Sequence, residues 1–77
     1  MKELADFVKT RRKQVNLTQL EFADRAGVAL TVIRKIEQNK TNLNLDKVNH
    51  VLKMFGHKLV PVSLKDIKED TTTYNSI

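Results

Sequence analysis

Apolar side chains recur at helical spacing in four segments of the chain, and polar residues between these segments mark where each helix should end. The first segment covers residues 2–15, and Asn16 after it tolerates the left-handed conformation found beyond helix ends. The apolar face of this segment contains Leu4, Phe7, Val8 and Val15. The pattern predicts an amphipathic helix over residues 2–15.

The second segment carries the clearest local start and stop signals. Thr18 is a favourable N-cap, and Glu21 three residues later completes a capping box. Leu17 and Phe22 flank this start at the positions of a hydrophobic staple. Gly27 then ends the helix, because glycine adopts a positive φ at little cost.

The third helix is predicted to begin near Ala29 and to run to about Gln38. Ala29 is a poor cap, so tertiary contacts must hold this start. The fourth helix begins after Asn44 as its cap and ends at Gly56. Its apolar stripe contains Leu45, Val48, Val51, Leu52 and Phe55. The chain is therefore expected to be all-α, with four to five short helices.

A short β-prone segment follows the fourth helix. It consists of Lys58, Leu59, Val60, Pro61 and Val62. A single strand leaves its amides and carbonyls without partners, so we expect this segment to pair antiparallel with its copy in a second chain. Pro61 keeps the ribbon two-stranded. Residues 1–63 would then form one domain with a dimerisation strand, and residues 64–77 a polar, disordered tail.

Charge and composition narrow the class of partner. Residues 1–63 contain twelve Lys and Arg against six Asp and Glu, within a chain of 77 residues whose net charge is +5. A compact basic body suits a polyanion. The chain has no cysteine, no apolar run approaching the ~20 residues of a membrane span, and no secretion signal at its start. We expect a cytoplasmic protein with no membrane association.

Catalytic and metal chemistry have little support. His50 and His57 are the only obvious candidates for a general base, and their spacing fits no zinc site. Gly27 and Gly56 are the only glycines, so there is no glycine-rich phosphate loop. We expect no enzymatic activity, no metal and no cofactor.

The second and third helices form a helix-turn-helix candidate over residues 18–38, with Gly27 in the turn. In such a pair the second helix enters the major groove while the first crosses the backbone. The outward side chains of the groove helix must be polar or basic, as Thr31, Arg34 and Lys35 are.

The sequence of this region resembles a known family. The matching residues are Leu17-Thr18-Gln19, Phe22-Ala23, Ala26-Gly27-Val28, Ile33 and Ile36-Glu37-Gln38-Asn39-Lys40. They look like the phage repressor and Cro-like (XRE) helix-turn-helix family, over about residues 4–55. Ala29, Phe22 and Asn39 depart from the usual pattern. The resemblance implies a lambda-repressor-like fold and a sequence-specific repressor of transcription that binds duplex DNA.

The resemblance also implies roles for individual residues. Base-facing positions would be Ala29, Leu30, Thr31, Arg34 and Lys35. Phosphate contacts would come from Thr18, Gln19, Asn39, Lys40 and Asn42. In this family the residues that match Arg12 and Glu37 pair across the core, and a half-buried Glu without a partner would be costly.

A narrower resemblance concerns the fourth helix. Leu45-Asp46-Lys47-Val48, Val51-Leu52 and Phe55-Gly56 before a short strand look like the HipB-like antitoxin branch. It implies a bacterial homodimer that binds a palindromic operator, represses its own operon and binds a HipA-like kinase toxin. Two alternatives stay open, namely an orphan regulator of the XRE type and a helix-turn-helix fold used only for protein interaction. Leu30, an apolar residue at a base-facing position, keeps the second alternative open.

Overall fold

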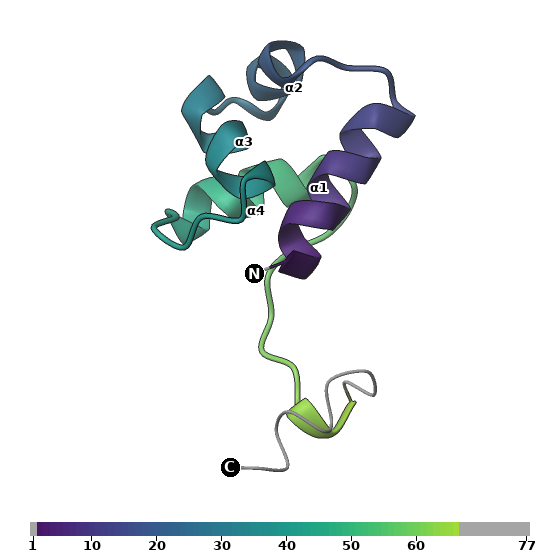
Figure 1. The fold of residues 1–77 in the computed structure, drawn as a ribbon, viewed down its shortest axis with the longest axis vertical. Helices are drawn as coiled ribbons and strands as arrows, with labels where there is room; N and C mark the ends of the chain where they lie inside the picture. The colour runs from purple at the N-terminus through teal and green to yellow at the C-terminus, as the bar shows by residue number, and fades with distance from the viewer. Residues whose placement is uncertain (1, 67–77) are drawn as a thin grey trace.

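The computed structural model describes residues 2–66 as an all-α fold (Figure 1). Its four α-helices are α1 (Lys2–Gln14), α2 (Gln19–Ala26), α3 (Leu30–Glu37) and α4 (Leu45–Lys53), and a 3₁₀ turn, η1 (Leu64–Asp66), follows. This part of the chain contains no strand. Of the expected polar tail, residues 67–77 lie outside the described residues. None of the helices described is long and apolar enough to cross a membrane.

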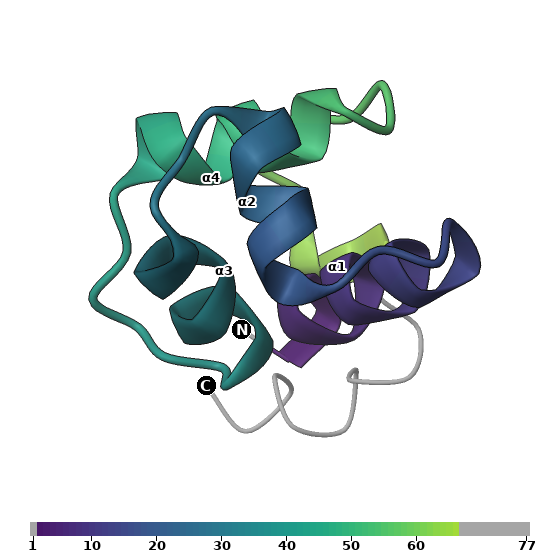
Figure 2. The ribbon, with the colours of Figure 1, turned by 90° about the horizontal axis from the view of Figure 1, so that it is seen from above.

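The helix α3 is the centre of the packing. It contacts α1, α2 and α4, and α2 also contacts α4 (Figures 1 and 2). The buried core draws on all four helices and contains Leu4, Val8, Phe22, Ala23, Ile33, Ile36, Val48, Val51 and Leu52. Packing on three sides fixes the position of α3 and leaves one face of this helix for solvent.

The local signals at both ends of α2 and at the start of α4 act as the sequence predicts, whereas α4 ends at Lys53 and not at Gly56 as predicted. The Thr18 hydroxyl accepts from the backbone N–H of Glu21 at 3.1 Å, and the Glu21 carboxylate accepts from that of Thr18 at 2.9 Å. Gly27 ends α2 with φ of 72°. The Asn44 side chain caps α4, while Ala29 caps α3 without a side-chain hydrogen bond. Tertiary packing therefore carries the start of α3.

Two apolar positions expected in the core are exposed. Val15 lies just beyond the last residue of α1 and is 50% exposed. The chain turns away there, since Asn16 has φ of 57°. Leu45 is the first residue of α4 and is 67% exposed. Helical spacing predicted both as buried, and it was wrong because each residue lies at a helix end, where the chain leaves the core.

Residues 58–62 form no strand in the single chain, and from them the chain runs away from the helices (Figure 1). Leu59 is half-buried against the core, and its backbone N–H donates to Asn49 Oδ1 at 2.8 Å. Val60 and Val62 are each more than half exposed. A strand paired across two chains needs a second copy, so it stays a prediction.

Candidate nucleic-acid interface

The outward face of α3 is polar and basic. Thr31, Arg34 and Lys35 are exposed, and Arg34 and Lys35 follow Thr31 by three and four residues, so both lie on the same side of the helix as Thr31. Ile33 and Ile36 on the opposite face are fully buried. The buried residues hold the helix, and the exposed ones are available to a ligand.

The start of α3 contributes less to this face than expected. Ala29 is exposed at the N-cap. Leu30 is only partly exposed and packs against the core. The structure therefore leaves a fraction of the Leu30 side chain outside. Sequence spacing could not show this, because the packing of α3 against its neighbours decides which side of its first turn is covered.

The N-terminus of α2 lies close to α3 and presents Thr18 and Gln19. Unpaired backbone N–H groups and the positive end of the helix dipole make such a terminus favourable for a phosphate. Glu21 also lies in this first turn. The hydrogen bond from the Thr18 backbone holds the pKa of the Glu21 carboxyl below its ordinary value. The Thr18 hydroxyl accepts from Glu21 and keeps its own proton to donate.

The loop after α3 carries the remaining expected phosphate contacts. Asn39, Lys40 and Asn42 are all exposed. Asn39 has φ of 59°, and the backbone N–H of Lys40 donates to the Lys35 carbonyl at 3.0 Å. The positive φ and this hydrogen bond turn the chain directly after α3. Lys40 therefore lies just beyond the helix whose outer face carries Lys35.

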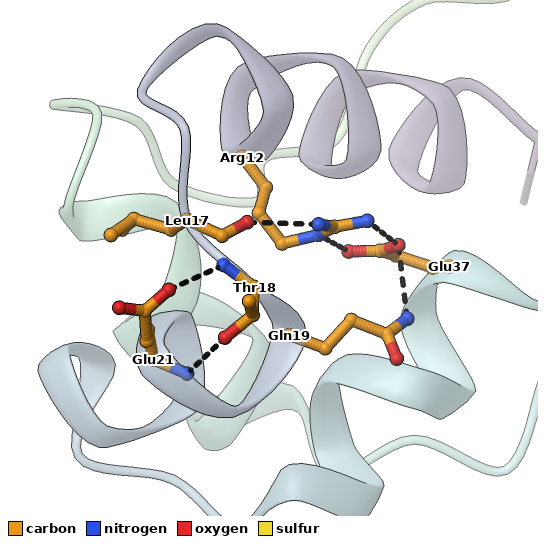
Figure 3. Close-up of polar contacts among 6 residues, drawn as sticks. All are labelled: Arg12, Leu17, Thr18, Gln19, Glu21 and Glu37. Carbon is orange, nitrogen blue, oxygen red and sulfur yellow. Dashed lines mark hydrogen bonds and ion pairs between the residues drawn. The ribbon is translucent and has the colours of Figure 1, made fainter.

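An ion pair joins α1 to the end of α3 (Figure 3). Arg12 Nε lies 2.7 Å from Glu37 Oε2, and Arg12 Nη2 lies 3.0 Å from Glu37 Oε1. Arg12 Nη1 also donates to the Leu17 carbonyl at 2.9 Å. The side chains of Arg12 and Glu37 are only 12% and 4% exposed. The hydrogen bond and the charge of Glu37 raise the pKa of Arg12.

A contact that the sequence did not reveal joins Gln19 to this pair. Gln19 Nε2 donates to Glu37 Oε1 at 3.1 Å (Figure 3). Gln19 was expected to contact a phosphate, and here its amide is half-buried and bound to α3. The two residues are 18 positions apart on different helices, so no periodicity in the sequence could indicate the contact.

The histidines lie away from these groups. His57 packs against the Phe7 ring at a centroid distance of 4.7 Å, and its Nδ1 lies 2.6 Å from the Phe55 carbonyl oxygen. His50 is exposed on α4. Within residues 2–66, no group of three or more His, Cys, Asp or Glu could hold a metal ion.

Comparison with known proteins agrees with this geometry. The family model described as helix-turn-helix matches residues 8–57, which include α2, α3, α4 and the second half of α1. None of the curated proteins matches the chain. The matched segment contains every residue of the candidate interface.

Proposed function

Because the chain belongs to the helix-turn-helix family, of the XRE type, and is thus a DNA-binding regulator of transcription, we propose that it is a sequence-specific repressor. In this proposal α3 enters the major groove and the N-terminus of α2 contacts the backbone. Thr31, Arg34 and Lys35 meet base edges, with Ala29 and part of Leu30 beside them. Thr18, Gln19, Asn39, Lys40 and Asn42 contact phosphates.

One observation carries the proposal. The helix α3 is packed on three sides, and its remaining face exposes Thr31, Arg34 and Lys35. Lys and Arg can bond guanine acceptors bidentately, and Thr can contact a thymine methyl. The proposed use as a protein-interaction module has less support, because Leu30, the apolar residue that favoured it, packs against the core.

A mobility-shift titration tests this function. The probe is duplex DNA from upstream of the protein's own gene, and the competitor is random duplex of equal length. We expect tighter binding to the upstream probe, and affinity for both that falls with salt as counterions are released. Equal affinity for the two duplexes contradicts sequence-specific repression, and no binding to either contradicts DNA binding.

A homodimer is part of the proposal. Val60 and Val62 are exposed apolar side chains two residues apart, so they share one face of an extended segment. Pairing residues 58–62 of two chains gives the backbone groups partners, and Val60 and Val62 would then cover the apolar ends of the fourth helices. Two copies of α3 would then face successive major grooves of a palindrome, with half-sites about 10 bp apart or a multiple of that.

The most specific part of the proposal is an antitoxin role. All four α-helices of the described residues contribute to one small core, so none of them forms a separate regulatory unit. A bound partner is one way to regulate such a repressor. The partner proposed is a HipA-like kinase toxin, and the alternative is an orphan regulator. Co-expression with the product of the adjacent gene, followed by a pull-down, separates the two, because recovery of the tagged chain alone favours the orphan regulator.

A further inference from the structure

The carboxylate of Glu37 is shared by two neighbours from different helices. Its Oε2 accepts from Arg12 Nε at 2.7 Å, and its Oε1 accepts both from Arg12 Nη2 at 3.0 Å and from Gln19 Nε2 at 3.1 Å (Figure 3). From these contacts we infer that the Arg12–Glu37 pair positions the amide of Gln19 for its contact with a DNA phosphate. This inference rests on the proposed function.

The chemistry of the amide makes its orientation matter. A glutamine side chain has two N–H donors on one end and an acceptor oxygen on the other. A phosphate only accepts, so only the nitrogen end of Gln19 can bind it. Ionised Glu37 also only accepts, and a flipped amide would place oxygen against oxygen. Glu37 therefore holds one N–H of Gln19 and leaves the second N–H of the same nitrogen for the phosphate.

Arg12 makes this arrangement compatible with DNA. An unpaired carboxylate beside the N-terminus of α2 would repel a phosphate, and the bidentate guanidinium of Arg12 cancels its charge. The same guanidinium donates to the carbonyl of Leu17, the residue just before the cap of α2. Arg12 thus fixes both the carboxylate that orients Gln19 and the backbone from which Gln19 projects.

A purely structural ion pair would explain the same distances, so the test must separate affinity from stability. The double substitution Arg12→Met with Glu37→Leu replaces the pair by apolar side chains, an exchange that often leaves a fold as stable as before. It removes the acceptor of Gln19 and keeps Gln19 itself. Unfolding by urea, followed by circular dichroism, checks that the variant is folded.

The measurement is operator affinity in a cycle with Gln19→Ala, using the upstream duplex as probe. In the wild-type background we expect Gln19→Ala to weaken binding about tenfold, as for a hydrogen bond to a charged group. The double substitution should weaken binding by a similar factor. Adding Gln19→Ala to it should then cost little more, because the positioned contact is already lost.

The salt dependence of binding distinguishes this inference from a general rearrangement of the interface, because a rearrangement would change the salt dependence. Gln19 is neutral and displaces no counterion, so its loss should not change the slope of log affinity against log salt. Lys40→Ala is the control, since it should reduce that slope by about 0.9. A changed slope in the double variant contradicts the inference.

A third substitution keeps the inference testable if the apolar pair fails to fold. Arg12→Lys retains both the carboxylate that accepts from Gln19 and a positive charge beside it, so the cost of Gln19→Ala should persist in that background. The inference alone is overturned by equal costs of Gln19→Ala with and without the Arg12–Glu37 pair, or by loss of that cost in Arg12→Lys. A wild-type chain that binds no duplex overturns the proposed function and the inference together.

Discussion

Replacing Glu37 by Ala should lower the stability of this domain far more than replacing any exposed charged residue. The change removes the acceptor of three hydrogen bonds, two from Arg12 and one from Gln19. It leaves the guanidinium of Arg12, only 12% exposed, without its carboxylate. Removing one partner of a buried pair costs about 3–5 kcal/mol, because the remaining charge stays desolvated. The loss would take a large part of the roughly 4–12 kcal/mol that stabilises a chain of this length.

Urea unfolding and thermal unfolding, each followed by circular dichroism, measure the loss of free energy and the shift in melting temperature. The expected shift in melting temperature is at least about 12 °C, at roughly 4 °C or more per kcal/mol for a domain of this size. Asp6→Ala is the matched control, since Asp6 is an exposed carboxylate on α1, and it should change stability by no more than about 0.5 kcal/mol. A loss below about 1 kcal/mol for Glu37→Ala, the value of an exposed ion pair, would refute the reasoning from burial.

Four further predictions each concern one residue or one pair of residues. Lys35→Ala should cost about 1–3 kcal/mol on the operator and less on random duplex, with the melting temperature unchanged, and equal losses on both would remove its base-facing role. Since the folded state lowers the pKa of Glu21 below 4.5, the wild type should be more stable than Glu21→Gln above that pH. This advantage should vanish as the pH falls through the folded-state pKa, so a melting-temperature gap equal at pH 7 and about pH 3 would contradict the stated cause. Val60→Lys with Val62→Lys should sediment as a monomer and melt as the wild type does, whereas a persistent dimer would exclude the proposed strand pairing. Gly27→Ala should cost about 1–2 kcal/mol from its φ of +72° alone, because a β-carbon there meets no atom within 4 Å, and a much larger loss would indicate a steric clash.

The helices could be predicted because their signals are local. A capping box needs only Thr18 and Glu21, and a helix end needs only a residue such as Gly27 that accepts a positive φ. The start of α3 at Ala29 has no side-chain cap, and there the apolar spacing of Ile33 and Ile36 alone located the helix. Local caps and apolar spacing together thus account for the fold class and for the approximate position of each helix.

The site was less predictable because it depends on angles between helices. The resemblance placed Thr31 and Lys35 at base-facing positions, but it also placed Leu30 there, and packing against the core covers part of that side chain. The contact between Gln19 and Glu37 joins two helices and leaves no periodic trace in the sequence. The strand predicted at residues 58–62 would need a second molecule, which no property of one chain can supply.

The division of α3 into a buried and an exposed set of side chains has a consequence for how such a protein can change. Ile33 and Ile36 hold the helix in place, and Thr31, Arg34 and Lys35 take no part in that packing. Exchanging the outer three should therefore redirect the protein to a new operator without lowering its melting temperature. A gene duplicate could acquire a separate set of target promoters through a few substitutions, so two copies could diverge into independent circuits while their scaffolds remained interchangeable.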